Sequence, residues 1–249
     1  MDYAAALIEQ NHMLGELLRD ADWSRPVPTC PGWTLSQLLR HVGRGDRWAA
    51  QIIADRVDSG LDPRAVRDGK PPADVPGALR WLADSPRTVL AAVRTVVENT
   101  EVWTFLGPKP ASWWVRRRLH EATVHRADAA IALDVAYELS AELAADGISE
   151  WLDRLVEEQA LGRPPSLPAG TSMALRATDA DLATNTWTVH GGERGMRWTD
   201  QPAGADVTLS GTATDLLLAM VRRRSIDDVD IRIEGDTALW HSWLELTPL

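Results

Sequence analysis

One stretch of the sequence carries a carboxylate and an imidazole at a spacing that suits joint chemistry. Glu121 and His125 lie four residues apart within residues 113–128, a stretch that we interpret as one long helix. Residues four apart project from the same helix face, so this pair can serve one site. His120 lies well off this face. Helical spacing extends the stripe to Trp114, Arg118, Asp128 and Ala132.

A third candidate side chain, His41, lies on a separate predicted helix. The residues Thr34-Leu-Ser-Gln37 have the spacing of a capping box, which marks a helix start. Apolar residues follow at helical spacing and place His41 at the edge of their stripe. A catalytic zinc ion, or a similar divalent ion, commonly takes three protein ligands, and His41, Glu121 and His125 would supply them. Glu and His four apart also occur as ordinary exposed helix pairs, so spacing alone leaves both interpretations open.

Cysteine usage and composition limit the kind of site. The 249 residues are 45% hydrophobic and 25% charged, which is ordinary for a globular protein of one large or two modest domains. Cys30 is the single cysteine, so a disulfide framework or a cysteine-rich zinc cluster is excluded. Any metal must therefore use histidine and carboxylate ligands. Cys30 itself lies between Thr29 and Pro31 in a predicted turn, and we interpret it as a small buried residue rather than a nucleophile.

The charge and hydropathy of the chain argue against two classes of partner. A net charge of −10 and a pI near 5.1 disfavour nucleic acid, whose phosphates require clustered Lys and Arg. The dense basic runs, 116–118 and 222–224, are interpreted as helix faces or contacts for small anions. The absence of an apolar run of about 20 residues disfavours a membrane span, and no secretory leader is recognised at the start. We therefore expect a cytoplasmic protein.

The pattern of the first two thirds predicts helices. Amphipathic spacing predicts helices at residues 2–19, from 34 onward, at 113–133 and at 140–161. A short helical turn is expected at 78–83. Ser85-Pro86 then suggests the cap and first turn of a new helix to about residue 97. Ser112 is a candidate cap for the long helix. Proline- and glycine-rich loops are expected at 59–76 and 99–111. The pattern favours an antiparallel helical bundle over residues 1–163.

The periodicity changes after the segment 162–170, which combines three prolines with a glycine at each end. Residues 164–249 are predicted to form a small α+β domain. We expect strands at 173–177, 186–190, 196–198, 206–210 and 229–234, and helices at 216–223 and from Asp236 to 246. The fold class predicted for the whole chain is therefore an α bundle followed by an α+β domain.

Three motifs resemble the mycothiol-dependent maleylpyruvate isomerase family, whose members belong to the DinB-like metal-binding helix bundles. The first is Pro26-Val-Pro-Thr-Cys-Pro-Gly-Trp-Thr-Leu-Ser-Gln-Leu-Leu-Arg-His41, and the second is Arg118-Leu-His-Glu-Ala-Thr-Val-His-Arg-Ala-Asp-Ala129. Leu209-Ser-Gly-Thr-Ala-Thr-Asp-Leu-Leu-Leu-Ala-Met-Val-Arg-Arg-Arg224, followed by Ile233-Glu-Gly-Asp236, is similar to the second domain of the family. The resemblance covers both predicted domains.

The resemblance implies a divalent metal, usually zinc, held by His41, Glu121 and His125. In the family the metal coordinates the sulfur of mycothiol, the low-molecular-weight thiol of actinobacteria, and so lowers the pKa of that thiol. The thiolate adds to the cis double bond of maleylpyruvate, the adduct rotates, and elimination yields fumarylpyruvate. Metal-ligand chemistry alone leaves iron or nickel open as alternatives to zinc.

Three further residues have candidate roles in catalysis. Asp128 would accept a hydrogen bond that orients a metal ligand, or else would pair with a neighbouring arginine. Arg223, chosen from 222–224 by similarity to the family, would bind an anionic substrate through its guanidinium, or else would lie at a solvated helix end. The same two alternatives apply to Arg118.

Two other functions remain open at the level of sequence. A mycothiol S-transferase that conjugates electrophiles would use the same ligands but would consume the thiol. A non-catalytic module that binds a small ligand would need no catalytic metal. In the two enzymatic cases the expected partners are mycothiol and a small electrophile, with neither nucleic acid nor membrane involved.

Overall fold

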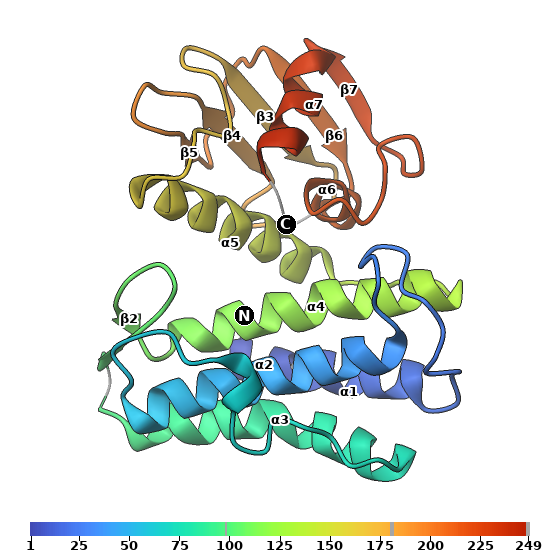
Figure 1. Cartoon of the computed structure of the whole chain (residues 1–249). Helices are drawn as coiled ribbons and strands as arrows, with labels where there is room; N and C mark the ends of the chain where they lie inside the picture. The colour runs from blue at the N-terminus through green and yellow to red at the C-terminus, as the bar shows by residue number, and fades with distance from the viewer. Residues whose placement is uncertain (98, 180–181, 248–249) are drawn as a thin grey trace. The chain divides into compact units, whose positions relative to one another are not determined.

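The computed structural model describes residues 1–97, 99–179 and 182–247 (Figure 1). The chain forms two compact units, Met1–Tyr137 and Glu138–Leu249. Within the described residues, no helix is both long and apolar enough to cross a bilayer.

The first unit is a bundle of four helices (Figure 1). Helices α1 and α2 each pack against both α3 and α4, so each helix has two principal neighbours. Leucine side chains such as Leu7, Leu14 and Leu38 are fully buried between them. The predicted helical bundle is therefore confirmed. Its helices are α1 Tyr3–Leu18, α2 Leu35–Asp55, α3 Val75–Thr95 and α4 Trp113–Leu133.

The start of α2 has the predicted capping box. Thr34 accepts a hydrogen bond from the Gln37 backbone N–H at 3.4 Å, and the Thr34 N–H donates to Gln37 Oε1 at 2.8 Å. The apolar stripe that follows is fully buried, at Leu35, Leu38, Leu39 and Val42. His41 is half-buried at the edge of this stripe, as its spacing predicts.

The third helix differs from its prediction, because α3 is continuous where we expected a short turn followed by a new helix. It begins after Asp74, whose side chain accepts from the Gly77 N–H at 2.8 Å. Pro86 lies inside the helix, where its missing N–H removes one backbone hydrogen bond. Ser85 is buried and donates to the Trp81 carbonyl at 2.7 Å, so it is not a cap. Burial of α3 residues on both sides of the proline explains why the helix continues.

The connections in the first unit contain little regular structure. A short 3-10 helix, η1 Pro63–Ala65, lies in the expected loop at 59–76. Strands β1 Glu101–Val102 and β2 Lys109–Pro110 pair antiparallel within the expected loop at 99–111. Ser112 makes no side-chain capping bond, so that prediction was wrong. Its backbone is already helical (φ −61°, ψ −23°), whereas a capping residue is normally extended.

The second unit is an α+β domain, as predicted (Figure 1). Its five-stranded sheet has the order β5-β4-β3-β6-β7, in which β3 and β6 are parallel and the other neighbours antiparallel. Helix α5 packs on α6, and α6 packs on β3 and β6. The elements are α5 Ala141–Ala160, β3 Ser172–Ala177, β4 Thr186–His190, β5 Arg197–Thr199, β6 Val207–Gly211, α6 Ala213–Met220, β7 Arg232–Gly235 and α7 Thr237–Leu246.

The division between the units lies before α5, whereas the sequence places a domain boundary after residue 163. Contacts between α5 and the sheet explain the difference. Ser149 Oγ accepts from Trp187 Nε1 at 2.8 Å, and Gln159 Oε1 accepts from the Met196 N–H at 2.7 Å. An amphipathic pattern shows that a helix buries one face, but it does not show which partner covers that face.

Candidate metal centre

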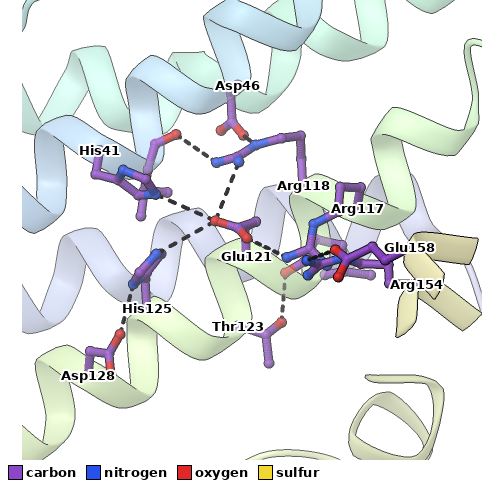
Figure 2. Close-up of polar contacts among 12 residues, drawn as sticks. His41, Asp46, Arg117, Arg118, Glu121, Thr123, His125, Asp128, Arg154 and Glu158 are labelled. Carbon is purple, nitrogen blue, oxygen red and sulfur yellow. Dashed lines mark hydrogen bonds and ion pairs between the residues drawn. The ribbon is translucent and has the colours of Figure 1, made fainter. Parts of the chain in front are cut away.

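Three side chains from two helices converge in the first unit (Figure 2). His41 comes from α2, and Glu121 and His125 lie one turn apart on α4. Glu121 Oε2 lies 3.5 Å from His41 Nε2 and 3.6 Å from His125 Nε2. One potential ligand atom from each residue lies within 4.8 Å of the other two. The structure thus brings together the three residues that the sequence suggests as metal ligands.

The exposure of these side chains changes across the group. The His41 side chain is 40% exposed, that of Glu121 is 26% exposed and that of His125 is 10% exposed. His41 is therefore the most exposed of the three side chains, and His125 is the most buried.

Two arginines keep Glu121 ionised. Arg117 Nη2 donates to Glu121 Oε1, and Arg118 Nη1 lies 3.7 Å from Glu121 Oε2. Burial, the largest single influence, favours the neutral acid. The charges of the two arginines and the hydrogen bonds from the histidines outweigh burial and hold the pKa of Glu121 well below its usual value. Glu121 is therefore a carboxylate at neutral pH.

The two histidines have opposite pKa shifts. Burial lowers the pKa of His41 and outweighs the opposing hydrogen bond to Glu121, so the lone pair of this imidazole is available near neutral pH. Burial also acts to lower the pKa of His125, but hydrogen bonds to Asp128, Cys30 and Glu121 raise it to about 10. A cation at His125 Nε2 must therefore displace a proton.

Asp128 orients His125. The His125 Nδ1–H donates to Asp128 Oδ2 at 2.7 Å, and the Asp128 side chain is fully buried (Figure 2). This bond directs the other ring nitrogen, Nε2, toward Glu121. The contact with a candidate ligand, one of the alternatives predicted for Asp128, is present, and its role in metal binding stays a prediction.

The donor set fits a divalent metal ion. Two imidazole nitrogens and one ionised carboxylate oxygen are ligands that zinc and other borderline ions accept. A histidine whose second ring nitrogen donates to a carboxylate is a common arrangement in metal sites. The fit therefore rests on the chemistry of the three residues and on the buried carboxylate behind His125.

Arg118 joins the two helices that carry the candidate ligands. Its Nε donates to Asp46 Oδ1 at 2.9 Å, and its Nη2 donates to the Val42 carbonyl at 3.1 Å. Its side chain is 6% exposed, which excludes the solvated position weighed as its alternative. Burial, opposed by Arg118, raises the pKa of Asp46 to about 6. The close approach requires Gly45, because a Cβ there would lie 2.4 Å from Arg118 Nη2.

Arg223 lies in the second unit, just after α6. Its side chain is half-buried, and Nη1 donates to the Val221 carbonyl at 2.8 Å. Its binding of a substrate anion stays a prediction. The neighbouring Arg222 donates to the carbonyls of Leu244 and Thr247, which gives it a structural role at the end of α7.

Sequence reasoning missed three residues of the site. Arg117 contacts Glu121 from the next turn of α4 but was considered only as part of a basic run. Trp33 is half-buried, and its ring centroid lies 4.8 Å from that of His41 and 6.0 Å from that of His125. Cys30, interpreted as a buried small residue, is half-buried with Sγ 3.4 Å from Asp128 Oδ2. Only the i, i+4 spacing of Arg117 and Glu121 was a usable signal.

The remaining histidines are not part of the group of candidate ligands. His12 and His241 are exposed, and His190 is half-buried at the end of β4. His120 is buried in α4.

Comparison with known proteins agrees with this architecture. Models of the mycothiol maleylpyruvate isomerase N-terminal domain and of the MDMPI C-terminal domain match residues 4–130 and 142–242. Uncharacterized proteins from two strains of Mycobacterium tuberculosis are each 25% identical over 239 residues, which cover 90% of this chain and 84% of theirs. Crystal structures of the mycothiol-dependent maleylpyruvate isomerase and of a histidine-to-alanine mutant of it each have a TM-score of 0.59 against this chain. They are 18% and 15% identical and cover 92% of this chain and 91% of theirs. The similarity to the solved structures shows the fold, and the two family models show that this chain belongs to the mycothiol maleylpyruvate isomerase family.

Proposed function

We propose that this protein is a metal-dependent enzyme that uses mycothiol to isomerise maleylpyruvate to fumarylpyruvate. The observation that carries the proposal is the convergence of His41, Glu121 and His125, with ligand atoms within 4.8 Å of one another, in a member of this family. The proposed metal is zinc, because two histidines and one carboxylate are a common zinc ligand set.

The chain's own residues prepare the ligand set. Asp128 holds a proton on His125 Nδ1 and leaves Nε2 as the ligand atom. Arg117 keeps Glu121 ionised, and burial keeps His41 neutral. When bound to these residues, a divalent ion would lower the pKa of a coordinated thiol and so supply a thiolate near neutral pH.

The proposed reaction leaves the thiol unconsumed. The thiolate sulfur forms a bond to one carbon of the cis double bond, and the π electron pair moves toward the adjacent carbonyl as an enolate. Rotation about the new single bond follows. The enolate then re-forms the double bond as trans and expels the thiolate. We propose that Arg223 binds a substrate carboxylate through its guanidinium during this cycle.

The proposal is tested by following substrate isomers and free thiol together. Zinc-loaded protein is incubated with mycothiol and maleylpyruvate, the isomers are separated by liquid chromatography, and the free thiol is titrated. We expect fumarylpyruvate to accumulate while free thiol stays constant. Loss of thiol with formation of a stable thioether would identify an S-transferase instead and would contradict the isomerase assignment.

Ligand variants test the site itself. His41→Ala and Glu121→Gln should each abolish turnover and weaken zinc binding on the order of a hundredfold or more. His12→Ala is the matched control, because His12 is exposed on α1 and outside the group. A wild-type protein that gains no divalent ion on zinc addition, measured by elemental mass spectrometry, would instead support a non-catalytic binding module.

A further inference from the structure

Residues 26–34, just before α2, form a closed turn whose side chains contact Asp128, the carboxylate that is hydrogen-bonded to His125. An isolated bridge between Pro26 and Thr34 closes the turn. The Val27 N–H donates to the Trp33 carbonyl at 2.9 Å, and the Cys30 N–H donates to the Val27 carbonyl at 3.0 Å. These bonds hold the backbone of the turn, so its side chains have defined positions.

Two adjacent side chains of this turn contact Asp128. Thr29 Oγ1 donates to Asp128 Oδ1 at 2.5 Å, and Cys30 Sγ lies 3.4 Å from Asp128 Oδ2 with the geometry of a hydrogen bond. His125 Nδ1 donates to the same Oδ2 at 2.7 Å. Both oxygens of the buried carboxylate are thus engaged, and rotation of Asp128 would break at least one of these bonds.

We propose that Thr29 and Cys30 are positioning residues that fix the metal-binding orientation of His125 through Asp128. With the carboxylate clamped from both sides, the Nδ1–H of His125 has one well-placed acceptor, and Nε2 points toward Glu121. Trp33, from the same turn, lies across the His125 ring with an interplanar angle of 26°. The consequence for metal affinity rests on the proposed function, whereas the orientation of His125 does not.

The same contacts weigh against a separate metal site at this position. Cys30, His125 and Asp128 also offer ligand atoms within 4.8 Å of one another. However, Asp128 accepts hydrogen bonds from Thr29, Cys30 and His125. A cation at this position would have to displace the protons that Cys30 and His125 share with the carboxylate. The distances from Asp128 to Thr29, Cys30 and His125 match hydrogen bonds that support His125.

The first test observes the His125 Nδ1–H directly in full-length, chelator-treated protein. Selective ¹⁵N labelling of histidine and NMR measure its exchange with solvent. We expect a protected signal in the wild type and exchange faster by roughly an order of magnitude in Thr29→Val, since a loosened acceptor opens more often. Thr95→Val is the control, because that hydroxyl bonds to the Ala92 carbonyl. Absence of a protected signal in the wild type, or equal exchange in Thr29→Val, would overturn the proposal.

The cysteine is tested by a conservative pair of variants. Cys30→Ser retains a donor and should keep the slow exchange, whereas Cys30→Ala removes the donor and should accelerate it. If Cys30→Ser behaves like Cys30→Ala, the thiol acts by packing or as a ligand and the positioning role of Cys30 is rejected. Circular dichroism at the assay temperature establishes that each variant is folded.

The second test asks whether Thr29 acts through Asp128. Zinc affinity is measured by competition with a chelator for wild type, Thr29→Val, Asp128→Asn and the double variant. We expect Thr29→Val to weaken binding on the order of tenfold, with little further loss when Asp128 is already Asn. Equal loss in both backgrounds would overturn action through Asp128. Failure of the wild type to bind zinc would reject the proposed function, and the exchange measurement would still decide the role of the turn.

Discussion

The buried ion pair between α2 and α4 has a measurable dependence on pH. Asp46 is fully buried, and its pKa is raised from 3.8 to about 6 despite the Arg118 guanidinium at 2.9 Å. The native state therefore holds this proton more tightly than the unfolded chain does. Stability from this group is fully present below about pH 4 and is lost as pH rises through 6. Because one pKa unit corresponds to about 1.4 kcal/mol, ionising Asp46 costs the native bundle about 3 kcal/mol.

The variant Asp46→Asn isolates this cost. An asparagine presents an uncharged acceptor to Arg118, much as a protonated Asp46 does. Near pH 4 the free energy of unfolding should therefore depend on pH alike in wild type and variant. Between pH 4 and pH 7 the variant should gain about 3 kcal/mol of unfolding free energy relative to wild type. Amide hydrogen exchange in α2 and α4, corrected for intrinsic rates, reports the opening free energy of the bundle. If the difference between the two proteins stays constant within about 1 kcal/mol across this range, the assigned cost is wrong.

Two further substitutions probe the supports of the site. Gly45→Ala should push Arg118 away from its ion pair and destabilise the bundle by about 1–3 kcal/mol in thermal melts, whereas Gly15→Ala, whose Cβ would meet only a leucine methyl at 3.9 Å, should be neutral or stabilising. Equal melting temperatures of Gly45→Ala and Gly15→Ala would contradict the steric argument. Arg117→Met should raise the pKa of Glu121, because it removes the charge that most favours the ionised carboxylate. Zinc uptake, followed by chelator competition, should therefore fall off at a higher pH than in the wild type. An unchanged pH profile would show that Arg117 does not control this carboxylate.

Local patterns were sufficient to predict much of the fold. The capping box at Thr34 and the apolar stripe after it predict α2 and the position of His41 at its edge, and the structure agrees. The pattern around Pro86 misled because a proline after a serine resembles a helix start, while the burial that carries α3 through this point depends on tertiary packing.

The candidate site was predictable where helix spacing and helix capping place its residues. Glu121 and His125 are one turn apart, so their spacing suggests a common site. Thr29 is 99 residues from Asp128, and no periodicity links the turn to α4. The capped helix after Thr34 offered His41 as the third ligand, and the resemblance to a family supported that choice. The contacts of Thr29 and Cys30 with Asp128 required coordinates.

The most direct test of the central claim uses cobalt as a spectroscopic substitute for zinc. Metal-free protein is loaded with Co²⁺, mycothiol is titrated in, and the near-ultraviolet sulfur-to-metal charge-transfer absorption is recorded. We predict that the band grows to saturation at one mycothiol per cobalt in the wild type and in His12→Ala, and that it is lost in His41→Ala. Cobalt that binds to the wild type without producing this band on mycothiol addition would contradict the claim that His41, Glu121 and His125 hold a metal that activates the thiol.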